Sequence, residues 1–493
     1  MKIVLCSLYD VGASLGIKSI YLSLRQAGHA VKLLFYDTPR FSKLETDPFL
    51  EEINFPTEIP PIIEKDIALF KEIITSEDPE MIGFSLLSSH YEAAKRLTQE
   101  VRKVSNAIIV WGGVHAIIDP ESCIPYADYV CIGEGEEAIV ELVAAIEVKD
   151  FKHSIRGIWR KDSDERARSQ ERVLIDNIDS LTIKPIDIKD ILFVPRNRPQ
   201  IIWNQEIEKK TPYYSANYIT MTSRGCPIGC TFCINGCLQE KLNQKKGVRQ
   251  RSVRHVIDEL MLIKRSRIVQ QIIFMDDFFP VNMRWLQAFA KEYAEKIRVP
   301  FFCNFYPGQV NNDSVDLMTR AGLMYANMGI QSGSRRIRKD IFGRRESNKK
   351  IVNCANILNS RINMRYELIC DNPFETEDDV RETLDLFLQF PLPFSLMIFS
   401  LTYFPNYPIT DMAVKKGYIK EEMIYHELNK DFTRERKNTD PIITSLYMLI
   451  MATTKKEFKR SDIYTWSRDK ALIENPLKLS KHLVNYLKNS RCN

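Results

Sequence analysis

Short apolar runs alternate along the first 150 residues with longer segments whose apolar residues recur every three to four positions. The runs are KIVLCSL (2–8), AVKLLFYD (30–37), MIGFSLL (81–87), AIIVWGG (107–113) and YVCIGEG (129–135). Near-continuous apolar strands separated by helices are typical of a parallel sheet that is covered on both faces. We therefore predict an α/β chain that begins with a doubly wound, Rossmann-like domain over residues 1–150.

Small and polar residues follow each of these apolar runs. In a doubly wound sheet, ligands bind just outside the carboxyl ends of the strands. The loops expected to form such a pocket span residues 7–12, 88–90, 112–114 and 133–136.

The alternation stops over residues 151–205, which consist of short polar pieces and which we interpret as a connector. It then resumes with six further apolar runs: YITMTSRGC (218–226), QIIFMDD (271–277), PFFCNFYP (300–307), YANMGIQS (325–332), MRYELICDNP (364–373) and FSLMIFSLTYF (394–404). Six sequential strand–helix units predict a partial (β/α)6 TIM-like barrel over residues 206–410, with its chemistry at the carboxyl ends of the strands. Residues 411–493 are predicted to form a small helical C-terminal domain.

Composition narrows the class of protein. The chain has 493 residues, of which 44% are hydrophobic and 27% are charged, and its 69 basic and 64 acidic side chains leave a net charge of +5. This balance gives no electrostatic case for a nucleic-acid partner, and the basic segment 241–255 lacks the interleaved aromatic residues that stack on bases. The longest apolar stretch, LYMLIMA (446–452), is too short for a membrane span, and the amino terminus does not have the pattern of a signal peptide. We expect a cytoplasmic protein whose eleven cysteines are reduced.

Four cysteines crowd into the segment SRGCPIGCTFCINGC (223–237). Cys226, Cys230 and Cys233 have the spacing C-x-x-x-C-x-x-C, so one loop presents three thiols to a soft metal centre such as an iron–sulfur cluster, zinc or copper(I). Structural zinc normally takes four protein ligands, often from two C-x-x-C pairs, and no second pair is present here. Three ligands to a four-iron cluster would leave one iron open, whereas Cys237 as a fourth ligand would close the site.

The cysteine loop follows the first strand of the predicted barrel, and CPIGCTFC resembles the cluster-binding loop of the radical SAM enzymes. Other segments are similar to the subgroup of this family that has an N-terminal cobalamin-binding domain: RQRSVRHVIDEL, FMDDFF, WGGVHAIIDPE and CIGEGEEAIVEL. Two segments depart from the family pattern. GIQSGS has Gln331 where the family usually has Glu, and DNPFET stands where G-x-P-G-E-T is usual. The resemblance covers residues 1–405.

This resemblance implies three cofactors: a [4Fe-4S] cluster, S-adenosylmethionine and cobalamin. It implies that Cys226, Cys230 and Cys233 hold the cluster. It places S-adenosylmethionine against Phe232, Asp277, Phe278, Phe279, Gln331, Ser332 and Arg344. It places cobalamin against Ser7, Gly12, Ser88, Ser89, Gly112, Gly113, Val114, Gly133, Glu134 and Gly135.

Three alternatives stay open at these sites. Asp276 and Asp277 are also placed to cap the following helix. The chain lacks the D-x-H-x-x-G motif of domains that supply a histidine to cobalt, so we expect any cobalamin to bind without one, and His90 and His115 to be satisfied polar residues. The first domain is alternatively a degenerate one that only braces the barrel.

The activity implied by the resemblance is that of a cobalamin-dependent radical SAM methyltransferase. Such an enzyme would generate a 5′-deoxyadenosyl radical and transfer a methyl group from methylcobalamin to an unactivated carbon. The expected partners are a small-molecule or lipid-like substrate and a low-potential electron donor, either flavodoxin or ferredoxin. Two other hypotheses remain: a related enzyme with a non-methylating reaction such as cyclisation, and a non-catalytic iron–sulfur electron carrier or binding protein.

Overall fold

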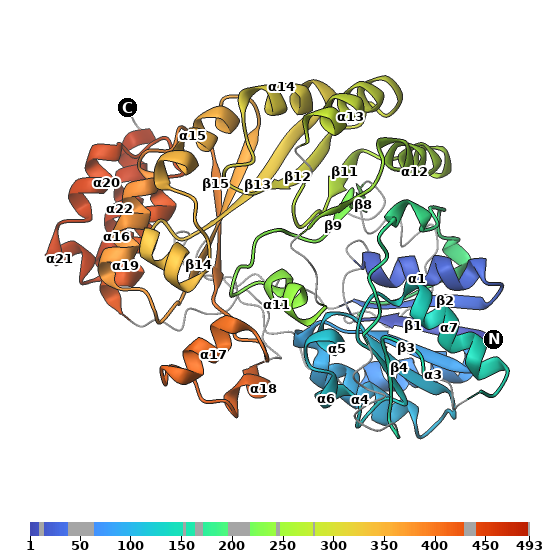
Figure 1. The fold of residues 1–493 in the computed structure, drawn as a ribbon. Helices are drawn as coiled ribbons and strands as arrows, with labels where there is room; N and C mark the ends of the chain where they lie inside the picture. The colour runs from blue at the N-terminus through green and yellow to red at the C-terminus, as the bar shows by residue number, and fades with distance from the viewer. Residues whose placement is uncertain are drawn as a thin grey trace.

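Two mainly parallel β-sheets form the framework of the molecule (Figure 1). The strands of the first sheet lie within residues 2–195, and those of the second lie within residues 217–400. This computed structural model describes residues 1–8, 14–37, 64–150, 154–162, 171–195, 217–242, 247–279, 282–427 and 440–491. Both sheets have helices packed against them, which confirms the predicted α/β class with a Rossmann-like domain followed by a partial barrel.

The first sheet has the strand order β6-β5-β4-β3-β1-β2-β7. Its strands are β1 (Lys2–Ser7), β2 (Ala30–Asp37), β3 (Met81–Ser85), β4 (Ile108–Gly112), β5 (Tyr129–Cys131), β6 (Ile158–Arg160) and β7 (Ile191–Pro195). All neighbours pair in parallel except β5 and β6, which are antiparallel. The segment 151–205, which we interpreted only as a connector, therefore supplies both edge strands of this sheet.

Helices cover the two faces of the first sheet with separate apolar clusters. Helices α1 (Leu15–Gln26) and α7 (Gly135–Glu147) pack on one face, and α3 (Glu64–Glu77), α4 (Tyr91–Val101) and α5 (Val114–Ile118) pack on the other, followed by the short α6 (Pro120–Cys123). The strands are buried from both sides for this reason, as their near-continuous apolar runs predict.

The second sheet has the order β15-β14-β13-β12-β11-β8, with all strands parallel. The strands are β8 (Asn217–Thr220), β11 (Gln271–Phe274), β12 (Phe301–Phe305), β13 (Leu323–Gln331), β14 (Asn363–Cys370) and β15 (Ser395–Ser400). The helices that accompany them are α12 (Val253–Ser266), α13 (Met283–Lys296), α14 (Asn312–Ala321), α15 (Asn348–Asn359) and α16 (Glu377–Phe387). Within the described residues β8 and β15 are the two edges, so the barrel is partial, as expected.

The second domain meets the first through a shared apolar core. One cluster of buried side chains includes Leu86 and Ile118 of the first domain together with Phe342, Tyr407 and Ala413 of the second. Helix α11 (Ile234–Lys241), drawn in light green between the two sheets in Figure 1, and helix α17 (Pro408–Lys415) border this core. We call this shared cluster the interdomain core.

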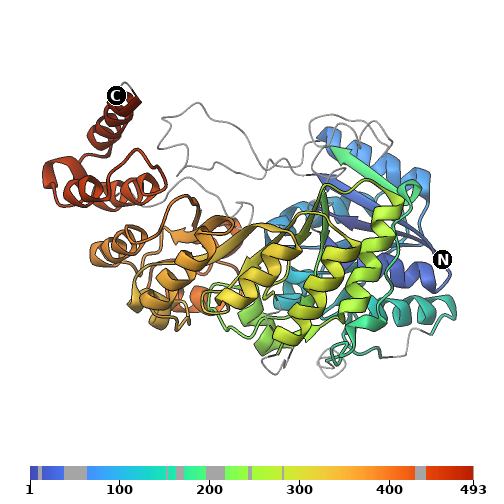
Figure 2. The same ribbon diagram turned by 90° about the horizontal axis from the view of Figure 1, so that it is seen from above.

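The C-terminal region is helical, as predicted; residues 440–491 lie against the outside of the barrel (Figure 2), whereas Tyr425 donates a hydrogen bond to Asp119 of the first domain. It comprises α18 (Met423–Glu427), α19 (Pro441–Ala452), α20 (Arg460–Trp466), α21 (Lys470–Ile473) and α22 (Pro476–Arg491). Helix α19 is apolar on nearly all sides because it is buried between α16 and α22.

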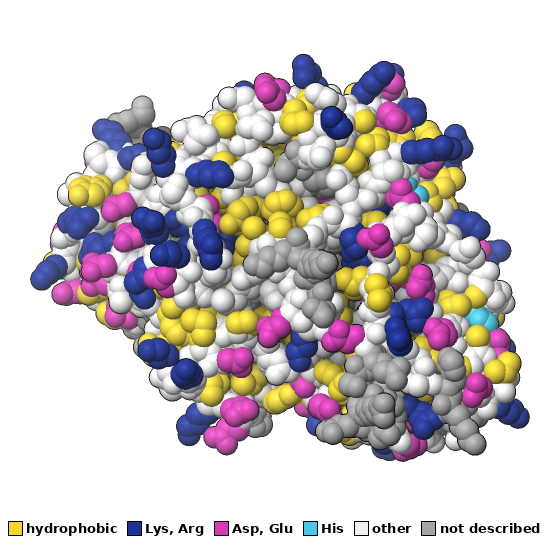
Figure 3. Space-filling model, in the orientation of Figure 1, with side chains coloured by type: hydrophobic (Ala, Val, Ile, Leu, Met, Phe, Trp, Pro, Cys, Tyr) yellow, Lys and Arg dark blue, Asp and Glu magenta, His cyan; other side chains and the backbone are white. Residues whose placement is uncertain are grey.

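The visible surface carries basic and acidic side chains intermixed, without a large patch of one sign on this face (Figure 3). None of the described helices is both long and apolar enough to span a bilayer.

Candidate functional site

A cavity of about 300 Å³ lies where the carboxyl ends of the first sheet face the second domain. Six of the residues that we associated with cobalamin line this cavity: Gly112, Gly113, Val114, Gly133, Glu134 and Gly135. Residues of the second domain, among them Asn235 and Asp277, line it as well. The volume is at the lower end of the range for ligand pockets, about 300–1,000 Å³, so it would enclose only part of a molecule as large as cobalamin.

The glycines at this cavity suit the close approach of a ligand. Gly113 has φ +89°, and a Cβ there would lie 2.7 Å from the backbone nitrogen of Leu86. A Cβ at Gly133 would meet no atom within 4 Å, because that position faces open space. The bare backbone at Gly133 can therefore contact a cofactor directly, whereas Gly113 is required for close packing against Leu86.

The other expected cobalamin residues are placed differently. Ser7 is buried and its hydroxyl lies 2.9 Å from that of Ser14. Ser88 and Ser89 are buried in the short 3-10 helix η1 (Ser88–His90) and do not line the cavity. Gly12 lies outside the described residues.

His115 is satisfied inside the first domain, as we expected. Its Nδ1 lies 3.1 Å from the hydroxyl of Ser88, and its Nε2 lies 3.2 Å from the hydroxyl of Ser122. Burial lowers the pKa of His115 to about 4, so the ring is neutral near pH 7.

The three cysteines of the motif lie on one loop between β9 (Ser223–Arg224) and α11. The loop is held to the barrel by Thr231, whose backbone N–H donates to the carbonyl of Phe342 (3.2 Å) and whose hydroxyl donates to that of Ile341 (2.6 Å). Among the residues that the structure describes, no three His, Cys, Asp or Glu side chains are close enough to share a single metal ion. The ligand role of Cys226, Cys230 and Cys233 stays a prediction.

The pKa values of the three thiols respond to burial and to a nearby cation. Burial raises the pKa of Cys226 to about 11, that of Cys230 to about 12 and also that of Cys233, so bound metal must displace their protons. The Arg344 guanidinium is close enough to lower the pKa of all three against this effect of burial. A buried cation beside three thiols favours their ionised form.

Cys237 is set apart from the other three. It is 2% exposed, packs in the interdomain core, and its thiol donates to the carbonyl of Asn406 (3.6 Å).

The residues expected to contact S-adenosylmethionine surround the cysteine loop at the ends of barrel strands. Asp277 lines the cavity; burial raises its pKa, against hydrogen bonds from Asn235 and from the backbone of Gly225. Phe278 lies beside the ring of Tyr306, with 6.2 Å between ring centroids. Phe232, which belongs to the cysteine loop, packs edge-on against Phe342.

Phe279 is the exception, because its ring is fully buried in the barrel core and packs edge-to-face against aromatic side chains of α13. Its carbonyl already accepts a hydrogen bond from the amide of Gln309 (3.1 Å).

Of the expected contacts at and after the end of β13, Arg344 is the one whose charge acts on the three cysteines. Gln331 adopts a left-handed backbone conformation with φ +69° at the carboxyl end of the strand. Ser332 is buried and donates to Glu375 (3.0 Å). The Arg344 guanidinium is 4% exposed, lies 4.7 Å from the centre of the Tyr306 ring and pairs with Glu346 at 2.9 Å.

Sequence reasoning missed the role of Asp276. Its carboxylate accepts hydrogen bonds from the backbone N–H (2.9 Å) and hydroxyl (2.8 Å) of Thr222 and from the hydroxyl of Ser223 (2.6 Å). It thus fixes the chain just before the cysteine loop. The alternative that it caps the following helix is not what the structure shows, because α13 is capped by Asn282. No local sequence signal identifies this role, because the partners Thr222 and Ser223 lie 54 and 53 positions away along the chain.

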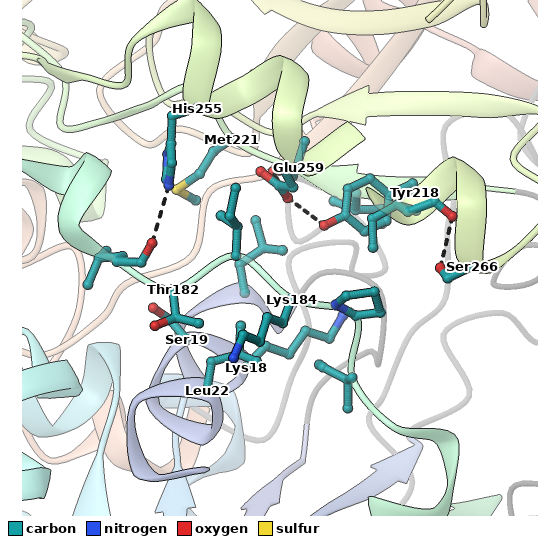
Figure 4. Close-up of a pocket in the computed structure, with 18 of the residues that line it drawn as sticks. Lys18, Ser19, Leu22, Thr182, Lys184, Tyr218, Met221, His255, Glu259 and Ser266 are labelled. Atoms are coloured by element: carbon teal, nitrogen blue, oxygen red, sulfur yellow. Dashed lines mark hydrogen bonds between the residues drawn. The ribbon is translucent and has the colours of Figure 1, made fainter. Parts of the chain in front are cut away.

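A second cavity, of about 550 Å³, lies between α1, the segment 178–187, β8 and α12 (Figure 4). It shares Leu15, Met221 and Arg224 with the first cavity. Its wall is held by hydrogen bonds: the hydroxyl of Tyr218 donates to Glu259, and His255 Nε2 lies 3.2 Å from the carbonyl of Leu181. We did not anticipate this cavity, because it depends on contacts between segments far apart in the sequence.

Comparisons with known proteins identify the families of the two domains. The model of the B12 binding domain family matches residues 1–143, and that of the radical SAM superfamily matches residues 220–387. Among curated proteins, an uncharacterized methyltransferase of Pyrococcus horikoshii is 27% identical over 54% of this chain and 54% of its own length. The anaerobic magnesium-protoporphyrin IX monomethyl ester cyclase of Cereibacter sphaeroides is 24% identical over 62% of this chain and 48% of its own length.

The chain thus spans about half the length of these curated relatives. Among solved structures, the radical S-adenosylmethionine methyltransferase TsrM of Kitasatospora setae superposes with a TM-score of 0.63 and 16% identity, over 84% of this chain and 76% of TsrM. At this identity the superposition supports the fold alone. The two family models match separate parts of one chain, so the protein carries a B12-binding domain over residues 1–143 and a radical SAM domain over residues 220–387.

Proposed function

We propose that this protein is a cobalamin-dependent radical SAM methyltransferase that methylates an unactivated carbon of a small-molecule or lipid-like substrate. The observation that carries the proposal is the 300 Å³ cavity, in which the glycine turns of the B12-binding domain face Asn235 and Asp277 beside the cysteine loop. A methyl donor and a hydrogen-abstracting radical must reach the same carbon, so their sites must adjoin.

When bound, the cluster supplies the electron that cleaves S-adenosylmethionine to a 5′-deoxyadenosyl radical, and cobalamin supplies the methyl group. The chain's own residues hold and shield these groups. Cys226, Cys230 and Cys233 would hold the cluster, with Arg344 favouring their thiolates. Asp277, at the cavity, would accept from an ammonium group such as that of S-adenosylmethionine. The interdomain core keeps water from the back of the site.

The names of the matched relatives suggest a second candidate reaction. One matched protein is named a methyltransferase and another a cyclase, so a non-methylating cyclisation is the second candidate. Flavodoxin or ferredoxin would supply the electrons in either case.

Radical chemistry is tested with reconstituted protein, S-adenosylmethionine and a strong reductant, by measuring 5′-deoxyadenosine. Replacing Cys226, Cys230 or Cys233 by alanine should abolish this product. Cys237→Ala is the matched control, because its thiol packs in the interdomain core, and it should retain the cluster. Wild-type protein that makes no 5′-deoxyadenosine would contradict the proposal.

Methyl transfer is tested separately with S-adenosylmethionine labelled in its methyl group. Reduced, cobalamin-loaded protein should form labelled methylcobalamin. If 5′-deoxyadenosine forms but no label reaches cobalamin, the cyclisation candidate replaces the methyltransferase.

A further inference from the structure

Four charged side chains meet where the B12-binding domain touches the β9–β10 ribbon, which consists of β9 and β10 (Arg249–Gln250). Arg224 donates to Glu134 (2.9 Å) and to Glu136 (2.5 Å). Arg249 donates through both terminal nitrogens to the two oxygens of Glu134, at 2.8 Å each. We call this group the arginine clasp.

The clasp is largely shielded from solvent. The side chains of Arg224, Glu134, Arg249 and Glu136 are 20%, 15%, 17% and 4% exposed. Burial acts to raise the pKa of Glu134, but the two arginines hold it below its usual value. Ion pairs shielded in this way are screened little by salt, and removing one partner leaves an uncompensated buried charge.

The ribbon brings two like charges together. Arg224 and Arg249 stand directly opposite each other in the β9–β10 pairing, an arrangement that is unfavourable by itself. The carboxylates that neutralise them come from the other domain: Glu134 ends the turn between β5 and α7, and Glu136 lies in the first turn of α7. The ribbon is therefore electrostatically complete only when it is docked on the B12-binding domain.

The clasp stands between the two predicted cofactor sites. Arg224 is followed by Gly225, at φ +95°, and then by Cys226, the first residue of the cysteine motif. Glu134 is flanked by Gly133 and Gly135, which line the 300 Å³ cavity. Both carboxylate oxygens of Glu134 are used by arginine, and Oε2 also accepts from the backbone N–H of Ile175 (2.8 Å). Any contact of Glu134 with a corrinoid would thus come from its backbone.

We propose that Glu134 is a positioning residue: with Glu136, it fixes the start of the cysteine loop through Arg224 and Arg249. The B12-binding domain would in this way set the geometry in which the cluster site binds S-adenosylmethionine. This inference rests on the proposed radical SAM function, and it adds that the two domains share one electrostatic device.

The test uses protein loaded with cluster and hydroxocobalamin, and it compares Glu134→Gln, Arg249→Gln and the double variant. The measurements are the Kd for S-adenosylmethionine, the change that this ligand causes in the EPR signal of the reduced cluster, and amide hydrogen exchange over residues 217–242. Each single variant should raise the Kd at least about fivefold and blunt the EPR change. The double variant should be no worse than the worse single one, because both remove the same interaction.

Glu137→Gln is the matched control. Glu137 lies in the first turn of α7, the helix that follows Glu134, and it pairs with Arg172 at 3.1 Å, but its side chain is 57% exposed. This variant removes the same charge and should keep the wild-type Kd and exchange. Where a glutamine variant fails to fold, Arg249→Lys preserves the charge and should give an intermediate Kd.

Several results would overturn the proposal. Faster exchange with an unchanged Kd and EPR response would make the clasp merely structural. Single-variant effects that multiply in the double variant, or a Glu137→Gln effect of equal size, would show that no specific clasp exists. Wild-type protein that binds no S-adenosylmethionine would refute the proposed function and the positioning role together, whereas normal wild-type binding with unaffected variants would refute the clasp alone.

Discussion

Replacing Gly236 by alanine should weaken cluster binding, although the same substitution usually stabilises a helix. Gly236 is the third residue of α11, where alanine is favoured over glycine by about 1 kcal/mol in helix propensity. A Cβ at this position would, however, lie 2.4 Å from the carbonyl oxygen of Cys230 and 3.3 Å from its carbonyl carbon. Because Cβ contacts below 3.0 Å are essentially never seen, the two backbones would have to separate by about 0.6 Å.

The clash should outweigh the gain in helix propensity. Forcing an extra methyl group into a packed site typically costs about 1–3 kcal/mol, and the contact here is with backbone rather than with a flexible side chain. The net loss, which is the clash minus the helix gain of about 1 kcal/mol, is up to about 2 kcal/mol and corresponds to a cluster site weakened by up to roughly 30-fold. The expected shift moves Cys230 directly, so the loss should appear in the cluster before it appears in the fold.

Iron retained per chain, measured after anaerobic reconstitution and competition with a chelator, checks this expectation. Gly229→Ala is the matched control in the same loop, because its Cβ would meet no atom closer than the Gln239 side-chain oxygen at 3.7 Å. Gly229→Ala should retain iron like wild type, whereas Gly236→Ala should lose it. Equal retention in the two variants, or a more stable cluster in Gly236→Ala, would refute the reasoning.

Three further expectations concern other parts of the molecule. Gly113→Ala should lower the thermal midpoint of unfolding, because Gly113 has φ +89° and the added Cβ would lie 2.7 Å from the backbone nitrogen of Leu86. Gly133→Ala should keep that midpoint but weaken cobalamin binding in an absorbance titration, because its Cβ would fill open space. Burial raises the pKa of Glu375 to about 8, against hydrogen bonds from Ser332 and Tyr447. The folded state therefore holds an extra proton between about pH 4.5 and 8, and its stability should fall with rising pH there by up to about 1.4 kcal/mol per unit; denaturation of Glu375→Gln at pH 6 and 8 should lack this slope. Asn311→Ala removes the capping box of α14 and should cost about 1 kcal/mol in denaturation while 5′-deoxyadenosine formation is retained.

Local patterns predicted the helices and strands well where the sequence itself contains the determinants. The segment 253–266 forms α12 because its apolar residues recur with helical periodicity and Ser252 caps its first turn, and both features are visible in the sequence. The strands β6 and β7 were not foreseen, because a strand of three to five residues depends on the neighbour that it pairs with rather than on its own composition.

The candidate site shows the same division. Its glycine turns and cysteine spacing are visible in the sequence, because each is a local motif. The pairing of Glu134 with Arg224 and Arg249 joins residues 90 and 115 positions apart, and no local pattern specifies it. The burial of Phe279 likewise depends on α13 packing over its ring, so a phenylalanine in the FMDDFF motif became part of the core.

The interdomain core determines how the protein should melt and how it can be divided. The interdomain core is one continuous apolar cluster that includes Leu86, Ile118, Phe342 and Tyr407. Neither domain therefore buries all of its apolar side chains without the other. A fragment ending at residue 195 would expose its part of that cluster to water and should aggregate. The two domains of the intact chain should instead unfold together in a single cooperative transition. Because opening the interface would expose the interdomain core to water, we do not expect substrate to enter by a hinge motion between the domains.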